Sequence, residues 1–533
     1  MYVIDNVLIE GNMPFLNKLM LLLILVQFVA VSAYFLHGYL LEAFRQRVFF
    51  DLQKTVFAKV LELPMSYFHA NESGYILSRV RNDTETSKGL MADTIINFLK
   101  DVATLAVGVV CLFVLHWKLA LFSCLLLPPF VISILSGGKR MRTMNRDLQE
   151  ASAQLNKEVA EDISLVASIK ALVIHKSVMR KYVSALRRYI DMSFRTSMYA
   201  MIFGGLTSFI GAAGPVILLW YGGSEIISGS LTFGRFFAFS MFLSYLFGPT
   251  QRLLNLNISI QSSLAAIDRV FEVLDHPSEP TAVNAGALRN PRGCVEFRNV
   301  VYSHDGPKPI IDDVSFIMQP GHLFAIAGRS GIGKTTILNL LMGYYQPLRG
   351  EVIVDGIDTR LLNNASLRAN IGFVPQGAPL FSTSIRENIR YGNLEASDEE
   401  IVDAAKLANA HQFISHLKDQ YGTLVGERGM KLSGGERQRI AIARAIVRKP
   451  RIFVFDESLS EVDLDSETLI MQSLLELKRT ATVIVVAHRP STVQKADMVF
   501  FLETGRIVGC GKHHDLVTCF PPYERLLTTA QTD

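Results

Sequence analysis

The sequence predicts an α-helical membrane part followed by a water-soluble α/β domain. The chain has 533 residues, of which 49% are hydrophobic and only 19% are charged, against about 25% charged in an average soluble protein. Its long apolar runs stop near residue 250, and from Cys294 onward short apolar strands alternate with helical segments. A chain of this length requires two or more domains, and its composition excludes a disordered chain, a collagen and a soluble coiled coil.

The first half carries five apolar runs that predict membrane-crossing helices: Leu19–Leu36, Val102–Leu115, Leu119–Leu135, Ile202–Tyr221 and Phe236–Pro249. The first run has eighteen residues without a charge, which approaches the length of a bilayer span. His116-Trp117-Lys118 joins the second run to the third, which is typical of a tight membrane hairpin with an interfacial tryptophan. Buried helices of a large soluble core are the alternative, and the scarcity of charges inside five runs disfavours it.

The basic residues gather in two long loops. Residues 38–95 carry seven Lys and Arg and residues 137–197 carry twelve, whereas residues 1–16 and 221–234 carry none. Because positively charged loops stay in the cytoplasm, we expect both long loops and the chain after Pro249 to be cytosolic and the N-terminus to be outside. Many helix formers and few helix breakers predict that the membrane helices continue into the cytosol and bend back. The expected location is the cell (inner) membrane.

We expect three parts along the chain: a transmembrane domain over residues 1–275, a linker over 276–293 and an α/β domain over 294–533. The linker is rich in Pro and Gly. A net charge of +4 is too small to imply nucleic acid as a partner. The five cysteines form no CxxC pair, so we expect reduced, unpaired thiols.

The segment Gly328-Arg-Ser-Gly-Ile-Gly-Lys-Thr-Thr336 carries the strongest chemical signal. It follows the apolar strand Leu323–Ala327 and opens a helical pattern, which is the setting in which G-x-x-x-x-G-K-[ST] binds phosphates. We expect the backbone N–H groups of this P-loop to bind phosphate oxygens, Lys334 to reach the β- and γ-phosphates, and the Thr335 hydroxyl to hold Mg²⁺. A chance glycine loop is the alternative. The predicted nucleotide-binding residues here are Gly328, Ser330, Gly331, Gly333, Lys334, Thr335 and Thr336.

A second candidate segment is the apolar strand Ile452–Phe455, which ends in Asp456 and Glu457. We expect Asp456 to steady Mg²⁺ through water, and Glu457 to polarise the attacking water as the general base. Taken alone, two acids after a strand more often mark a solvated loop. They gain weight in a chain that already has a phosphate loop.

A third candidate segment begins at Leu432 and contains Ser433, Gly434 and Gly435, ahead of a predicted helix over Arg439–Val447. A hydroxyl, exposed N–H groups and a helix terminus suit a phosphate. The alternative is a simple helix cap, which Ser-Gly-Gly also makes.

Together these motifs resemble those of ATP-binding cassette (ABC) exporter half-transporters, a family that includes lipid flippases and multidrug exporters. The resemblance covers nearly the whole chain. It implies that Gln376 of Val374-Pro-Gln376 senses Mg²⁺ and the membrane domain and that His488 contacts the γ-phosphate. Gly426-Glu-Arg-Gly429 and Ser460-Glu-Val-Asp463 match the X-loop and the D-loop of the family.

The same resemblance implies that Leu63–Phe68 and Ser168–Lys176 belong to the two intracellular loops through which exporters contact their cassettes. It implies ATP and Mg²⁺ as cofactors, with ATP held between the P-loop of one cassette and the signature segment at Ser433 of another. The implied partner is a second half-transporter. We expect a homodimer, and a heterodimer with a degenerate partner stays open.

The chain departs from the family pattern at three places. The adenine-stacking aromatic falls on His304, or on Tyr302 if the register is shifted by two residues. The D-loop carries Glu461 where alanine is usual. Five membrane runs stand where the family has six, so we expect the first membrane helix to be absent from this chain.

The resemblance implies ATP-driven export or flipping of a lipid, amphipathic or hydrophobic substrate by alternating access. The scarcity of charges inside the spans favours such a molecule over an ion. A peptide or a drug is the alternative cargo. A non-transporting, ATP-gated regulatory or structural membrane subunit is the alternative function.

Overall fold

A computed structural model of the chain describes residues 3–8, 13–89, 94–280, 286–289, 291–304, 306, 308–456, 464–487 and 489–525. The chain divides into two compact units, one formed by Met1–Leu61 with Ser73–His276 and the other by Glu62–Glu72 with Pro277–Asp533. The short segment Glu62–Glu72 therefore belongs to the second unit, although its sequence position places it within the predicted transmembrane domain.

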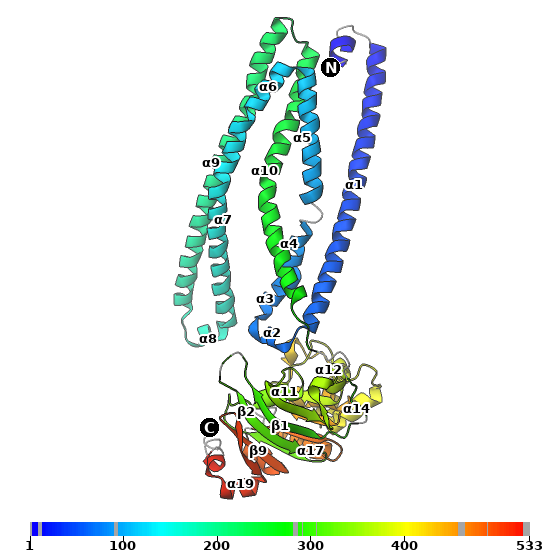
Figure 1. Cartoon of the computed structure of the whole chain (residues 1–533), viewed down its shortest axis with the longest axis vertical. Helices are drawn as coiled ribbons and strands as arrows, with labels where there is room; N and C mark the ends of the chain where they lie inside the picture. Colours follow the sequence, from blue (N-terminus) through cyan, green and yellow to red (C-terminus); the bar gives the residue numbers. More distant parts are fainter. Residues whose placement is uncertain are drawn as a thin grey trace. The chain divides into compact units, whose positions relative to one another are not determined.

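The regular elements described in the first unit are all helices (Figure 1). Five of them, α1, α5, α7, α9 and α10, are long, and the others are short helices or π-helical turns. In chain order they are η1 (Val3–Leu8), α1 (Met13–Glu62), α3 (Ser73–Ser78), η2 (Arg79–Asp83), α4 (Thr84–Gly89), α5 (Ile95–Leu115), α6 (Trp117–Leu125), α7 (Leu127–Ser164), α8 (Val166–Ala171), α9 (His175–Ile227) and α10 (Phe233–Asp275).

Four helical stretches are long and apolar enough to cross a membrane over their described residues: α1, α5, α6 with α7, and α9. They contain four of the five predicted runs. The fifth run, Phe236–Pro249, lies in α10, which is not among those four. The predicted extensions are present, because α1 runs on to Glu62 and because α7 and α9 carry most of the basic residues of the second long loop.

The predicted hairpin is divided into α5, α6 and α7 by helix breaks at His116 and Leu126. His116 leaves the helical conformation after α5, and its Nδ1 accepts a hydrogen bond from the N–H of Leu119 at 3.3 Å, which caps α6. The run Leu119–Leu135 is then interrupted at Leu126, after which two prolines stand in the first turn of α7. Proline fits there because the first N–H groups of a helix have no partner within it.

Glycine allows close approach between helices of this unit. A Cβ added to Gly108 of α5 would lie 2.9 Å from the Cβ of Tyr245 on α10, and one added to Gly222 of α9 would lie 2.4 Å from a ring carbon of Phe236. Small residues serve the same purpose at helix interfaces in membranes. Beside these contacts lies a buried cluster to which α5, α6, α9 and α10 contribute Leu112, Leu119, Leu218, Phe239 and Leu246.

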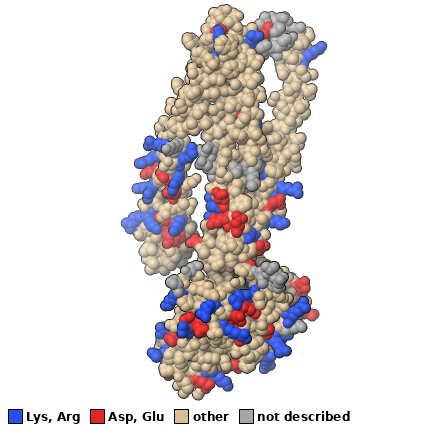
Figure 2. Space-filling view, in the orientation of Figure 1, with Lys and Arg blue, Asp and Glu red and all other residues tan. Residues whose placement is uncertain are grey.

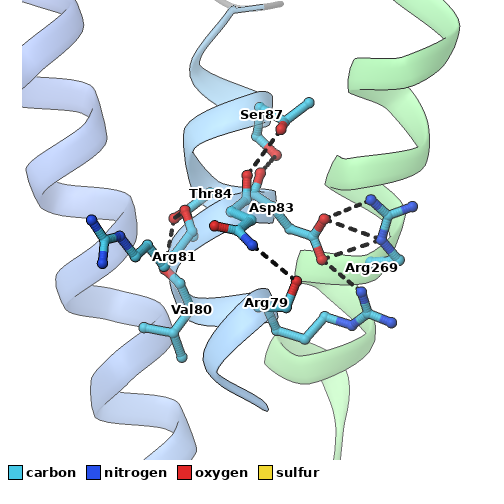
Figure 3. Close-up of polar contacts among 10 residues, drawn as sticks. Arg79, Val80, Arg81, Asp83, Thr84, Ser87 and Arg269 are labelled. Atoms are coloured by element: carbon cyan, nitrogen blue, oxygen red, sulfur yellow. Dashed lines mark hydrogen bonds and ion pairs between the residues drawn. The ribbon is translucent and has the colours of Figure 1, made fainter. Parts of the chain in front are cut away.

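Two ion-pair sites join α10 to the helices that precede it. Arg252 donates to Asp101 of α5, with 2.7 Å between Nη2 and Oδ1. Arg269 donates to Asp83 of η2 at 2.5 Å, and Arg79 donates to the other carboxylate oxygen at 2.7 Å (Figure 3). Both aspartates are buried, so α10 is held to these helices at two points along its length.

The charges of the first unit are unevenly distributed. Figure 2 shows Lys, Arg, Asp and Glu gathered toward one end of α7 and α9, whereas the apolar part of these helices presents few of them. Large side chains of that apolar part are exposed, among them Ile202, Phe209, Val216 and Trp220. Such a surface requires lipid or another apolar surface to cover it.

The second unit contains two sheets. The smaller sheet has the order β2-β1-β4-β5 and is antiparallel; the larger has the order β10-β9-β3-β8-β7-β6, with parallel pairing except between β9 and β10. The strands are β1 (Val295–Tyr302), β2 (Ile311–Met318), β3 (Leu323–Ala327), β4 (Arg349–Val354), β5 (Ile357–Asp358), β6 (Ile371–Val374), β7 (Ile452–Phe455), β8 (Thr482–Val486), β9 (Met498–Glu503) and β10 (Arg506–Gly511).

The larger sheet is buried on both faces, as parallel sheets are. Alternate residues of β3 enter two different cores: Leu323 and Ala325 lie in one, and Phe324 and Ile326 in the other.

The helices of this unit are α2 (Met65–Ala70), α11 (Lys334–Leu341), η4 (Thr359–Leu361), α12 (Asn364–Ala369), α13 (Ile385–Arg390), α14 (Asp398–Leu407), α15 (His411–His416), η5 (Gln420–Gly422), η6 (Glu427–Gly429), α16 (Gly434–Ile446), α17 (Leu464–Leu477), α18 (Pro490–Lys495) and α19 (His513–Cys519).

Candidate functional site: the nucleotide-binding edge of the cassette

The predicted P-loop connects β3 to α11. Gly333 stands immediately before α11 with a φ of 109°, and a Cβ added there would lie 2.9 Å from Ile311. Gly328 stands immediately after β3 with a φ of 156°, where a Cβ would lie 2.5 Å from the carbonyl oxygen of Leu502. Glycine is therefore required at both ends of the loop. Between them Ser330 and Gly331 are exposed, where a ligand can reach their N–H groups.

Lys334 is oriented into this loop. Its side chain is buried, and Nζ donates to the carbonyl oxygens of Gly328 at 2.8 Å and Arg329 at 2.9 Å. These two carbonyls hold the ammonium group inside the loop, where its charge is available to phosphate oxygens. Thr336, the other predicted residue of the first turn of α11, is buried.

Thr335 and Asp456 meet at the same edge of the sheet. Thr335 Oγ1 donates to Asp456 Oδ1 at 3.2 Å, and the Asp456 N–H donates to the carbonyl of Val374 at 3.0 Å. Mg²⁺ in phosphate-transfer sites binds hard oxygen atoms and keeps several of its waters, so the Thr335 hydroxyl can bind the ion directly and the Asp456 carboxylate can hold one of its waters. The pair therefore fits a Mg²⁺ ion that binds with a nucleotide.

The strands β3, β6, β7 and β8 are parallel and end at this edge. Gln376 follows β6 by two residues and is exposed. Because β6 and β7 are parallel neighbours, Gln376 stands at the same edge of the sheet as the end of β7. Glu457, His488 and the D-loop residues 460–463 lie outside the described residues, so their roles stay predictions.

The signature segment forms the start of α16. Ser433 caps this helix: its hydroxyl accepts from the N–H of Glu436 at 3.3 Å, and the Glu436 carboxylate accepts from the N–H of Ser433 at 2.9 Å. In the single chain, Ser433 therefore forms the helix cap that was the alternative interpretation of this segment. Ser433 is nevertheless exposed, Gly434 is half-buried and Gly435 is buried, so the hydroxyl remains accessible to a ligand.

The two candidates for adenine stacking differ in exposure. Tyr302 is buried, and its ring stacks on Tyr345 with 5.2 Å between centroids and 23° between planes. His304 is exposed, and its Nδ1 lies 2.9 Å from the Tyr302 hydroxyl. One face of the Tyr302 ring is therefore covered, and His304 is the side chain of the two that a base can reach.

Two residues beside this site were not predicted as part of it. Tyr345 follows α11, and His69 of α2 contacts it. Two sequence features pointed toward these residues: the adjacent tyrosines 344 and 345, and the resemblance of Leu63–Phe68 to an intracellular loop. The sequence alone did not show that His69 and Tyr345, which are 276 residues apart, are in contact.

Comparisons with known proteins agree with this geometry. Residues 1–250 match the family model for the ABC transporter transmembrane region, and residues 311–460 match the model for the ABC transporter. The chain is also similar over 98% of its length, at 28% sequence identity and a TM-score of 0.83, to the structure of a bacterial Atm1-family ABC exporter with ATP bound, of which it covers 93%.

Two curated relatives align over most of their own length. One is an ATP-dependent lipid A-core flippase of Syntrophus aciditrophicus, 32% identical over 98% of this chain and 87% of that protein. Another is YgaD, a putative multidrug export ATP-binding/permease protein of Bacillus subtilis, 34% identical over 90% of this chain and 83% of that protein.

The fold and the P-loop edge define an integral membrane protein with an ATP-hydrolysing cassette. The chain belongs to the ABC exporters, as a half-transporter that carries one membrane part and one ATP-binding cassette. It couples ATP hydrolysis to transport.

Proposed function

We propose that two copies of this chain export or flip a lipid or another amphipathic, hydrophobic molecule across the inner membrane, with the cassettes in the cytoplasm. ATP and Mg²⁺ bind at the P-loop of one copy and contact Ser433, Gly434 and Gly435 of the second. Glu457 acts as the general base and His488 contacts the γ-phosphate. Binding closes the cassettes and hydrolysis resets them, which is alternating access between two states.

The observation that carries the cargo class is a cavity of about 620 Å³ between α7, α9 and α10 of the membrane unit. None of the described side chains that line it is charged; aromatic rings, glycines and a few hydroxyl and amide groups form its wall, including Phe130, Phe203, Phe247, Thr207 and Gln251. Such a lining suits an apolar body with a small polar group.

Reconstitution into liposomes tests this proposal. We expect ATP hydrolysis stimulated by a lipid or amphipathic compound, ATP-dependent movement of that compound between leaflets, and loss of both in Glu457→Gln. If an added peptide or drug is moved and lipid is not, the cargo is a peptide or a drug, which is the alternative to the cargo class proposed here. Nucleotide binding without turnover in a folded dimer would instead support the alternative, a regulatory subunit.

A further inference from the structure

A row of four rings connects the predicted adenine-stacking position to the segment inserted from the membrane chain. His304 Nδ1 lies 2.9 Å from the Tyr302 hydroxyl, and the His304 ring meets Tyr345 edge-on with 5.0 Å between centroids. Tyr302 stacks on Tyr345 at 5.2 Å. The Tyr345 hydroxyl in turn lies 2.5 Å from Nδ1 of His69, on α2. The row runs without a gap from an exposed ring to the inserted segment.

The middle of this row is rigidly packed. Tyr302 and Tyr345 are both 7% exposed, and close-packed side chains transmit a displacement instead of absorbing it. Burial also raises the pKa of the Tyr345 hydroxyl, so this group stays protonated and keeps its bond to His69. The two ends of the row, His304 and His69, are exposed, and His304 is the end at the predicted adenine position.

The loop that carries Tyr345 is anchored by Arg368 of α12. Arg368 Nε donates to the carbonyl of Met342 at 3.0 Å, and its guanidinium lies 4.5 Å from the centre of the Tyr344 ring. Arg368 also donates to the carboxylate of Glu279 at 2.8 Å, and the Glu279 N–H donates to the carbonyl of Glu62 at 2.8 Å. Residues 62–72 are thus tied to the same loop at Glu62 and again at His69.

We propose that His304, Tyr302, Tyr345 and His69 are positioning residues that form an adenine-sensing relay. A base stacked on His304 fixes the orientation of that imidazole, and the packed tyrosines carry this constraint to α2. Because α2 lies between α1 and α3 in the chain, the relay reports the presence of the base, and not only of the phosphates, to the membrane helices. The proposal rests on nucleotide binding as set out under Proposed function.

Hydrogen–deuterium exchange of the full-length protein in lipid nanodiscs tests the relay. Two probes are compared at concentrations that protect residues 328–336 equally: the non-hydrolysable ATP analogue AMP-PNP, and inorganic tripolyphosphate, which fills the phosphate loop but has no base. The relay predicts slower amide exchange of residues 62–72 with AMP-PNP than with tripolyphosphate. Equal exchange of 62–72 with both probes overturns it.

Matched variants assign the effect to the ring row. Tyr345→Phe keeps the ring and removes the hydroxyl, and should reduce the base-dependent protection of residues 62–72 by roughly two- to tenfold, the worth of one hydrogen bond. His69→Phe should do the same, whereas His69→Asn, which keeps a polar atom near the position of Nδ1, should restore part of it. Tyr421→Phe is the control, because Tyr421 makes the same kind of contact, 2.8 Å to Nδ1 of His411, elsewhere in the cassette.

Two results separate this relay from the proposed function. Protection of 328–336 with an unchanged response of 62–72 in Tyr345→Phe overturns the relay and leaves ATP binding intact. Failure of AMP-PNP to protect 328–336 in the wild-type protein overturns nucleotide binding, and the relay with it.

Discussion

Lys334 is the residue whose chemistry is most directly visible in the cassette. Its ammonium is already held inside the loop by two carbonyl groups, so little reorganisation is needed when phosphates arrive. We expect Lys334→Met, which keeps the apolar stem, to lower the ATP hydrolysis rate by about 100-fold, in line with the loss of one preorganised electrostatic contact. The rate is measured on purified protein in lipid.

A lysine outside the site provides the control. Lys449 is exposed and pairs with Glu400 at 2.6 Å, and surface pairs contribute little to stability. Lys449→Met should keep the wild-type rate. A wild-type rate in Lys334→Met would show that the P-loop is not the site of turnover.

Asp456 makes a separate prediction about the metal. Asparagine in its place still accepts the hydrogen bond from Thr335 but lacks the negative charge. We expect Asp456→Asn to raise the Mg²⁺ concentration for half-maximal hydrolysis by about tenfold or more, the usual effect of losing an outer-shell carboxylate, while ATP binding measured without metal stays unchanged. If the Mg²⁺ concentration for half-maximal hydrolysis is unchanged in this variant, Asp456 is not part of the metal site.

At the scale of elements, the contact between α5 and α10 depends on Gly108. Valine there would place its side chain against the backbone and Cβ of Tyr245, and overpacking of this kind costs about 1–3 kcal/mol. We expect Gly108→Val to lower the unfolding temperature in detergent. Gly205→Val is the matched control, because a Cβ at Gly205 of α9 meets nothing within 4 Å; equal effects of the two variants would contradict close packing at Gly108.

The ion pair between η2 and α10 gives a pH-dependent prediction. Burial raises the pKa of Asp83, but hydrogen bonds from Arg269 and Arg79 outweigh it, and the pKa lies below its ordinary value of 3.8. The stabilisation is therefore complete above the ordinary pKa and is lost as the pH falls through the lowered value.

Asp83→Asn tests this ion pair. The variant leaves two arginines without a counter-charge, and since Arg269 is 39% exposed, solvent reduces the expected loss to about 1–3 kcal/mol. The gap in unfolding free energy between wild type and variant should stay constant from about pH 5 to 8 and narrow below about pH 4. A gap that changes between pH 5 and 8 would show that another group titrates.

At the scale of the whole molecule, the sequence predicted what local patterns determine. The P-loop follows a buried strand, Asp456 ends another, and Ser433 caps a helix, because each depends on a few adjacent residues. Contacts between distant segments were not predictable in this way. Asp83 meets Arg269 across 186 residues, and His69 meets Tyr345 across 276.

The same limit applies to the division into units. Residues 62–72 continue the chain of α1 but pack with the cassette, and no local composition marks that change. The run Leu119–Leu135 lies in one helical stretch long enough to cross a membrane, as predicted, but hydropathy does not register the turn at Leu126 ahead of two prolines. Catalytic assignments of Glu457 and His488 remain predictions from the family motif.

The central claim is that one nucleotide is held between two copies of the chain. Two differently tagged chains without their five native cysteines, one with Ser330→Cys and the other with Ser433→Cys, test it directly by cross-linking. Both positions are exposed, and a bismaleimide with a flexible spacer is used because a nucleotide between the two thiols keeps them beyond the reach of a direct disulfide, about 7 Å between Cα atoms. The account predicts a covalent dimer that carries both tags and forms in the presence of AMP-PNP. ATP hydrolysis by the cysteine-free parent without any nucleotide-dependent cross-link between the two chains would contradict it.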